Sequence, residues 1–140
     1  MPSPIHFALF FTVALLVITA YFMMGALPLL ILKHDTPLDS RFIRGFFNTY
    51  YRAAMFAAAG AAVSYAFWGR PAVALGAAAL AVAAVVLRAR IIPTMDHVGA
   101  LIQTNDAGAV ARFRRLHRAA IMVNLTQLVL VVWTLTTFKP

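Results

Sequence analysis

The feature that most constrains this sequence is a run of 28 residues, from Ile5 to Leu32, that contains no Lys, Arg, Asp or Glu. At ~1.5 Å per residue a helix of this length rises about 42 Å, which exceeds the ~30 Å hydrocarbon core of a bilayer. The run has neither the basic start nor the small-residue cleavage site of a signal peptide. We therefore expect it to be retained as a membrane helix.

The rest of the chain contains three more apolar segments, separated by short polar ones. Hydrophobic residues make up 63% of the sequence and charged residues only 11%, whereas a soluble domain is usually ~25% charged, so a soluble domain is excluded. The sequence predicts an all-α fold: an integral membrane four-helix bundle in up-down-up-down order, with residues 1–140 forming a single domain. The expected spans are approximately 5–32, 44–68, 71–93 and 117–138.

Local signals predict where these helices begin and end. Asp39 or Ser40 is expected to cap the second helix, which would begin near position 41. Pro93 is expected to end or disturb the third helix. Asn105 or Asp106 is expected to cap a basic segment that leads into the fourth helix.

The positive charges indicate an orientation in the membrane. Ten of the twelve Lys and Arg residues fall in or beside the first and third connections, and only Arg70 and Lys139 fall on the other side. Because cytoplasmic loops are enriched in Lys and Arg, both termini are expected to lie outside the cytoplasm, with the protein in the cytoplasmic (inner) membrane. Cations that cluster at the ends of apolar runs encode topology, so we do not interpret the net charge of +8 as nucleic-acid binding.

Small residues are frequent in the second and third helices, for example Ala57, Gly60, Ala61, Gly76 and Ala79. Small side chains at a spacing of four residues let membrane helices approach closely. The hairpin of these two helices is therefore expected to be the tightest contact in the bundle.

Polar residues lie in the part of the second helix nearest its expected cytoplasmic end. Asn48, Tyr51 and Arg52 fall within one sector of about 100° on a helical projection. In one interpretation the arginines only anchor the helix at the membrane interface. In the other, the three residues form a donor-rich wall for an anionic or carbonyl-bearing ligand.

The ends of the third and fourth helices offer similar alternatives. The third helix carries Arg88, Arg90, Asp96 and His97, which form either an ion-pair collar at the inner interface or part of a binding site. On the fourth helix, polar side chains either hydrogen-bond to a neighbouring helix or line a ligand or proton path. These side chains are His117, Asn124 and Gln127.

Cofactor chemistry has little support in the sequence. His34, His97 and His117 all fall on the cytoplasmic side, near Asp35 and Asp96, and imidazoles on facing helices are able to bind a metal or haem. No HxxxH or HExxH spacing occurs, and there is no cysteine. We therefore predict no cofactor, with haem or a metal at the histidines as the alternative.

The sequence at the start of the fourth helix resembles that of a known family. Phe113-Arg114-Arg115-Leu116-His117-Arg118, followed by Asn124-Leu125, is similar to the F-x-x-L-H…N-L signature of a family of unknown function that includes transmembrane protein 205-like proteins. Arg88 with Ile91-Ile92-Pro93, and the aromatic segment 46–51, also resemble this family. The resemblance implies a small four-span membrane protein without an established activity. The anthrone oxygenases have a similar four-span plan, but this chain has Arg-Leu-His where they show a tryptophan-containing approach to the last helix.

Three classes of function remain open. The favoured one is a non-enzymatic binding or accessory protein that holds an anionic lipid, another anionic amphiphile or a partner subunit at its Arg-rich end. The second is a membrane redox, oxygenase-like, haem-binding or metal-binding protein that uses His97 and His117. The third is a structural subunit of a larger membrane complex or homo-oligomer. Membrane lipids are expected partners in each case.

Overall fold

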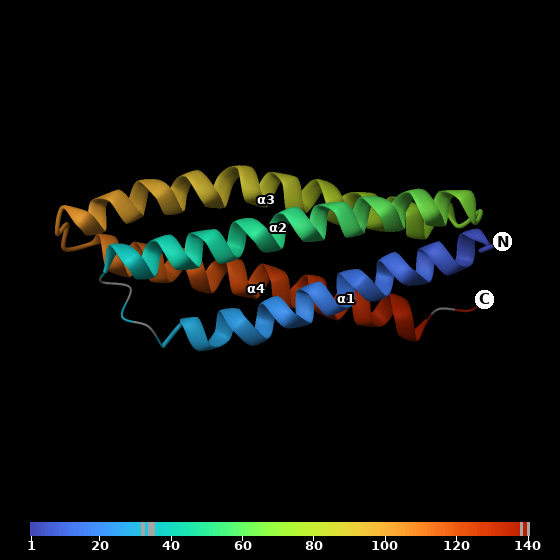
Figure 1. The fold of residues 1–140 in the computed structure, drawn as a ribbon, viewed down its shortest axis with the longest axis horizontal. Coiled ribbons are helices and arrows are strands. Elements are labelled where there is room, and N and C mark those ends of the chain that lie inside the picture. The colour runs from blue at the N-terminus through green and yellow to red at the C-terminus, as the bar shows by residue number, and fades with distance from the viewer. Residues whose placement is uncertain (32, 34–35, 138, 140) are drawn as a thin grey trace.

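Four antiparallel α-helices make up the fold. The computed structural model describes residues 1–31, 33, 36–137 and 139, and within this part of the chain it contains helices and no strands. Successive helices run in opposite directions, so both termini lie at one end of the bundle (Figure 1). The all-α, up-down-up-down prediction is therefore confirmed. The helices are α1 (Pro4–Leu29), α2 (Pro37–Phe67), α3 (Pro71–Gln103) and α4 (Ala109–Thr136).

The start of α2 lies earlier than the sequence predicts. Thr36, rather than Asp39 or Ser40, is the N-cap, and its side chain accepts a hydrogen bond from the Asp39 amide at 3.2 Å. Pro37 then occupies the first turn, where its missing N–H and fixed φ carry no penalty. The pair Thr36-Pro37 is thus a stronger start signal than the polar residues that follow it.

Pro93 does not end α3, which continues ten residues further to Gln103. A proline inside a helix removes one backbone hydrogen bond and crowds the preceding turn. Here the apolar face continues past it, and Met95, Val98 and Ile102 are all buried. We infer that this packing offsets the local penalty, so the expected end at Pro93 is wrong.

The α3–α4 connection contains a compact turn. Gly108 is the N-cap of α4, in place of the expected Asn105 or Asp106. Asn105 adopts a left-handed φ of 57°, and Asp106 accepts hydrogen bonds through Oδ1 from the Gly108 amide at 2.9 Å and the Arg112 guanidinium at 3.3 Å. The α2–α3 connection is shorter still, and a φ of 74° at Gly69 allows the reversal.

Three of the four helices, α1, α3 and α4, are long and apolar enough to cross a membrane. Over its 33 residues α3 rises about 50 Å, which exceeds the ~30 Å hydrocarbon core. α2, with 31 residues, is also long enough but is not apolar enough, because Asp39, Arg41, Arg44 and Arg52 interrupt it. The expectation of four spans is therefore supported for three helices by length and composition.

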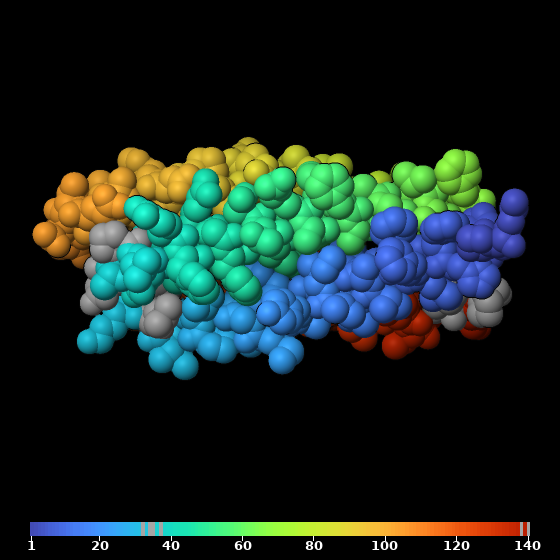
Figure 2. Space-filling model, in the orientation of Figure 1, coloured from blue at the N-terminus to red at the C-terminus, as the bar shows by residue number. Residues whose placement is uncertain are grey.

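α2 makes the most extensive contacts of the four helices. It lies between α1 and α3, with α4 on the far side (Figure 1), and α1, α2 and α3 cover the face seen in Figure 2. Its most extensive contact is with α3, as the small-residue pattern predicts. The closest glycine contact, however, is with α1, because a Cβ at Gly60 would lie 2.5 Å from the Phe11 ring.

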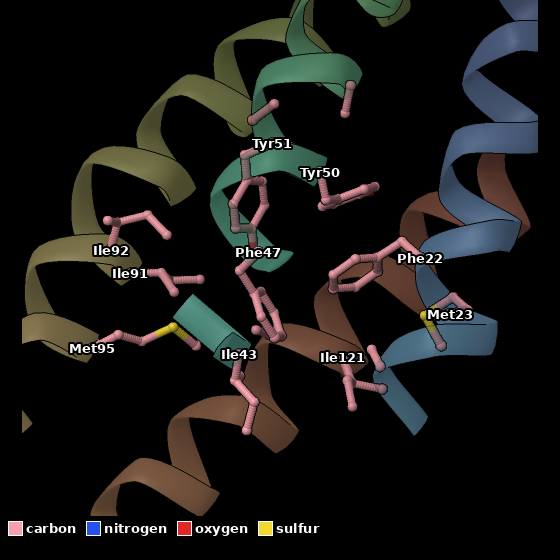
Figure 3. Close-up of a cluster of buried hydrophobic side chains, with 14 of the residues drawn as sticks. Phe22, Met23, Ile43, Phe47, Tyr50, Tyr51, Ile91, Ile92, Met95 and Ile121 are labelled. Carbon is pink, nitrogen blue, oxygen red and sulfur yellow. The ribbon is translucent and has the colours of Figure 1, made fainter. Parts of the chain in front are cut away.

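Aromatic rings fill the core near the middle of the bundle. Phe22 of α1 stacks on Tyr50 of α2, with ring centroids 4.0 Å apart, and meets Phe47 edge to face at 4.9 Å. Figure 3 shows Phe47 and Tyr51 between Phe22 on one side and the isoleucines of α3 on the other. These contacts fix the rotation of α2 and so decide which of its polar residues face outward.

Candidate functional site

The nine residues that the sequence singles out separate into two groups. Tyr51, His117 and Asn124 lie inside the bundle, each no more than 1% exposed. The other six lie on the outer surface of α2 and α3: Asn48, Arg52, Arg88, Arg90, Asp96 and His97. The structure therefore does not bring Asn48, Tyr51 and Arg52 into one wall.

The outer group follows the seam between α2 and α3. Arg88 of α3 donates from Nε to Oδ1 of Asn48 on α2 at 2.9 Å. Two turns further along α3, Asp96 accepts two hydrogen bonds from Arg44 of α2, at 2.9 and 3.2 Å. The predicted ion pairing of Asp96 is thus confirmed, with Arg44 as its partner. The seam carries its polar contacts on the outside of the helix pair.

Cations outnumber acids at this end of the bundle. Among the described residues, Asp96 pairs with Arg44 and Asp106 with Arg112. Several other arginines form no ion pair within the described part of the chain: Arg41, Arg52, Arg88, Arg90, Arg115 and Arg118. Excess positive charge therefore faces outward along the seam and around the loops.

A shallow indentation of about 240 Å³ lies at the end of the seam. Ser40, Arg41 and Arg44 of α2 line one side, and Asp96, Gly99 and Gln103 of α3 line the other. A Cβ at Gly99 would approach the Ser40 hydroxyl at 3.3 Å, so the two helices are close here. Its polar lining and small volume suit a headgroup or an ion better than a drug-sized apolar ligand.

The inner group belongs to a larger buried polar cluster. His117, Asn124 and Gln127 lie on the inward face of α4, and each is buried. Tyr51 of α2 faces Asn124 closely enough to interact electrostatically, and Tyr50 interacts in the same way with Thr19 of α1. The cluster therefore includes residues of α1, α2 and α4.

Several polar atoms of this cluster lack a hydrogen bond of good geometry. These are both amide atoms of Asn124, Nε2 of Gln127 and the hydroxyls of Tyr50 and Tyr51, counted among the described residues. Burying such a group without a partner costs about 1–3 kcal/mol. The interior of the bundle thus contains polar groups whose hydrogen bonding is incomplete among the described residues.

Tyr50 and Thr19 also belong to this cluster, although the sequence does not predict either as a site residue. Thr19 donates to the Leu15 carbonyl at 2.7 Å, as threonine commonly does within a helix, so its position carries no distinctive pattern. Tyr50 lies outside the polar sector of α2 and is placed inside by its stacking on Phe22. No pattern in the amino-acid sequence indicates that either residue belongs to the buried polar cluster.

The histidines do not converge. His97 is exposed on α3, whereas His117 is buried and meets the Phe47 ring edge to face at 5.3 Å. Within the described part of the chain no three His or Asp side chains are grouped to hold a metal ion. His34 and Asp35 lie outside the described residues. The described residues thus contain no three-ligand metal group, and the two described histidines near this end differ in exposure.

Comparison with known proteins gives no relative for this chain: no family model, curated protein or solved structure matches it. Functional inference therefore depends on the geometry of the two polar groups.

Proposed function

We propose that this protein is a non-enzymatic membrane protein that binds the phosphate of anionic lipid headgroups at its α2–α3 seam. The observation that carries the proposal is the Arg88–Asn48 hydrogen bond, which fixes an outward-facing guanidinium on the seam. Arg52 lies one helical turn from Asn48 on the same face and is also exposed. Arginine suits this task because it stays charged and its planar fork matches phosphate oxygens.

The depth of these arginines supports a phosphate ligand. Counted from the end where the termini lie, the first charged residue is Arg52 on α2, Arg88 on α3 and Arg118 on α4. The uncharged stretches before them are 53–67, 71–87 and 119–136, which rise about 22, 26 and 27 Å. These lengths approach the ~30 Å hydrocarbon core, so the three arginines would lie near the level of the lipid phosphates.

The hydrogen bond to Asn48 holds the Arg88 guanidinium in place before a lipid phosphate binds. A long, exposed arginine loses side-chain freedom when it binds, and a guanidinium already held at Nε loses less. Its two terminal nitrogens remain directed away from that contact. The nearest acid on the seam, Asp96, is already paired with Arg44 and does not compete.

The proposal includes an orientation. All four helices would cross the cytoplasmic membrane, with both termini outside the cytoplasm and the Arg-rich end inside. Because the chain has no cysteine, single-cysteine variants report this directly. Ser3→Cys should react with an impermeant maleimide on intact cells, and Thr104→Cys only after permeabilisation. The reverse pattern would overturn the orientation.

Lipid binding is tested with purified protein and two lipids, phosphatidylglycerol and phosphatidylcholine, by native mass spectrometry. The double variant Arg52→Gln/Arg88→Gln should weaken phosphatidylglycerol binding about tenfold, since one charge-assisted hydrogen bond contributes about 1.5 kcal/mol. Arg112→Gln/Arg115→Gln removes the same charge from α4 at the same end and serves as the matched control.

The control should keep the preference for phosphatidylglycerol. An equal loss in both double variants would mean that net charge, rather than the seam, attracts the lipid. An unchanged number of phosphatidylglycerol molecules bound to Arg52→Gln/Arg88→Gln would remove the seam as a binding site and leave a protein partner as the better explanation of the exposed arginines.

A further inference from the structure

A groove of about 690 Å³ opens at the opposite end of the bundle, where the termini lie. Its walls come mainly from the start of α3 and the end of α4, and its floor from α1 and α2. The volume lies in the ~300–1,000 Å³ range of small-molecule sites. The seam proposed above lies at the other end of the bundle, so the groove is a separate feature.

Small side chains on α3 create the groove. Ala72, Gly76 and Ala79 line it, and a Cβ added to Gly76 would meet nothing within 4 Å. α3 packs much more extensively against α2 than against α4. The first turns of α3 therefore stand apart from α4 and leave an apolar channel between them.

The groove reaches the centre of the bundle. Leu15, Ala61 and Val131 line it and are each only 2% exposed. The polar groups at its floor are hydrogen-bonded to each other, because the Thr12 hydroxyl and the Tyr65 hydroxyl lie 3.0 Å apart. Its interior thus favours an apolar chain over a polar ligand.

The mouth of the groove is cationic. Arg70 and Lys139 are the only Lys or Arg residues of this end of the chain, and both line the groove. The Arg70 guanidinium lies 4.8 Å from the centre of the Trp68 ring and donates from Nη2 to the Lys139 carbonyl at 3.0 Å. One of its five N–H groups is used in that bond, and the others are available to an anion.

From this combination we propose that the groove binds an anionic phospholipid, with one acyl chain between α3 and α4 and the phosphate at Arg70 and Lys139. Charge complementarity selects this occupant. A helix of a second copy would bring no acid to these cations, since the four aspartates, at positions 35, 39, 96 and 106, belong to segments of the other end. A zwitterionic lipid would fill the channel but gain less at the mouth.

The chain contains its own reporters for this site. Its only two tryptophans, Trp68 and Trp133, both line the groove. In detergent, phosphatidylglycerol with brominated acyl chains should therefore quench tryptophan fluorescence at several-fold lower concentration than brominated phosphatidylcholine does. Lipid bound at the α2–α3 seam, whose headgroup would lie about 22 Å or more along the helices from this end, is controlled for by Arg52→Gln/Arg88→Gln, which should leave this quenching unchanged.

Two variants test the two parts of the site. Arg70→Gln/Lys139→Gln should make the two lipids quench equally, and Gly76→Leu, which fills the channel, should weaken quenching by both. Arg112→Gln/Arg115→Gln removes the same charge at the far end and should keep the wild-type preference. Circular dichroism and size-exclusion chromatography check that each variant remains folded.

Equal quenching of the wild-type protein by the two lipids would overturn the proposal. So would a preference that persists in Arg70→Gln/Lys139→Gln. A dimer that Gly76→Leu converts to monomer would also overturn it, because a second copy would then occupy the groove. Failure of the seam variants to affect lipid binding would leave this result unchanged, so the two proposals are tested separately.

Discussion

Replacing Asn124 by leucine should stabilise this protein, although the residue is completely buried. Asn and Leu side chains have the same branching and the same number of heavy atoms, so Asn124→Leu removes the polarity with a moderate increase in volume. Neither amide atom of Asn124 has a hydrogen bond of good geometry with a described residue. The substitution therefore removes a desolvation penalty without opening a cavity.

The size of the effect follows from two opposing contributions. An unpartnered buried polar atom costs about 1–3 kcal/mol, and one is removed, because the other amide atom of Asn124 interacts with Tyr51. Against this, the electrostatic contact of Asn124 with Tyr51 is lost; interhelical hydrogen bonds in membranes average about 0.6 kcal/mol. The Tyr51 hydroxyl also stays buried without its neighbour. We expect a net gain of about 1–2 kcal/mol in the free energy of unfolding.

The assay is reversible unfolding in mixed micelles, followed by circular dichroism. The matched control is Asn48→Leu, the same substitution at a half-buried site where the side chain accepts a hydrogen bond from Arg88. That variant should lose about 0.5–1.5 kcal/mol. A loss of more than about 1 kcal/mol in Asn124→Leu would refute the reasoning, because it would mean that the buried amide has a strong partner in the folded protein.

Other predictions concern packing and charge. Gly60→Ala should lower the free energy of unfolding by about 1–3 kcal/mol, because its Cβ would lie 2.5 Å from the Phe11 ring. Gly45→Ala, whose Cβ would meet nothing within 4 Å, should raise it by about 0.5–1 kcal/mol through helix propensity. Unfolding titrations that give the two variants equal stability would contradict this. For the half-exposed pair Arg44 and Asp96, a double-mutant cycle should give a coupling of about 0.2–1 kcal/mol that declines with added salt. A coupling that salt does not alter would show that the pair is better shielded than its exposure indicates.

The number and type of the helices were predictable because uncharged runs of membrane length have few alternatives to helix. Helix ends were less predictable. The end expected at Pro93 was wrong since a single proline penalty is small beside the buried packing of Met95, Val98 and Ile102. That packing depends on neighbours that a one-dimensional pattern does not contain.

The sequence predicted which polar residues to consider for the candidate site, but not how they are arranged in space. Tyr51 and Arg52 lie at opposite edges of the 100° sector, because adjacent residues are separated by 100° around a helix. The boundary between interior and surface falls between them, so Tyr51 is 1% exposed while Arg52 faces outward. The rotation of α2 that decides this is set by aromatic contacts with Phe22, which have no signature in the α2 sequence.

The low apolarity of α2 has a consequence for how the chain enters a membrane. α2 is synthesised before α3, its most extensive contact, and is not apolar enough to partition into lipid alone. The turn between Phe67 and Pro71 is short enough for the two helices to pair as soon as α3 emerges. Insertion of α2 as a hairpin with α3 would bury the face of α2 that packs against α3 and would pair Arg44 with Asp96 during transfer. A nascent chain stopped at Trp68 should therefore leave α2 at the membrane surface, and one that extends through α3 should draw it in.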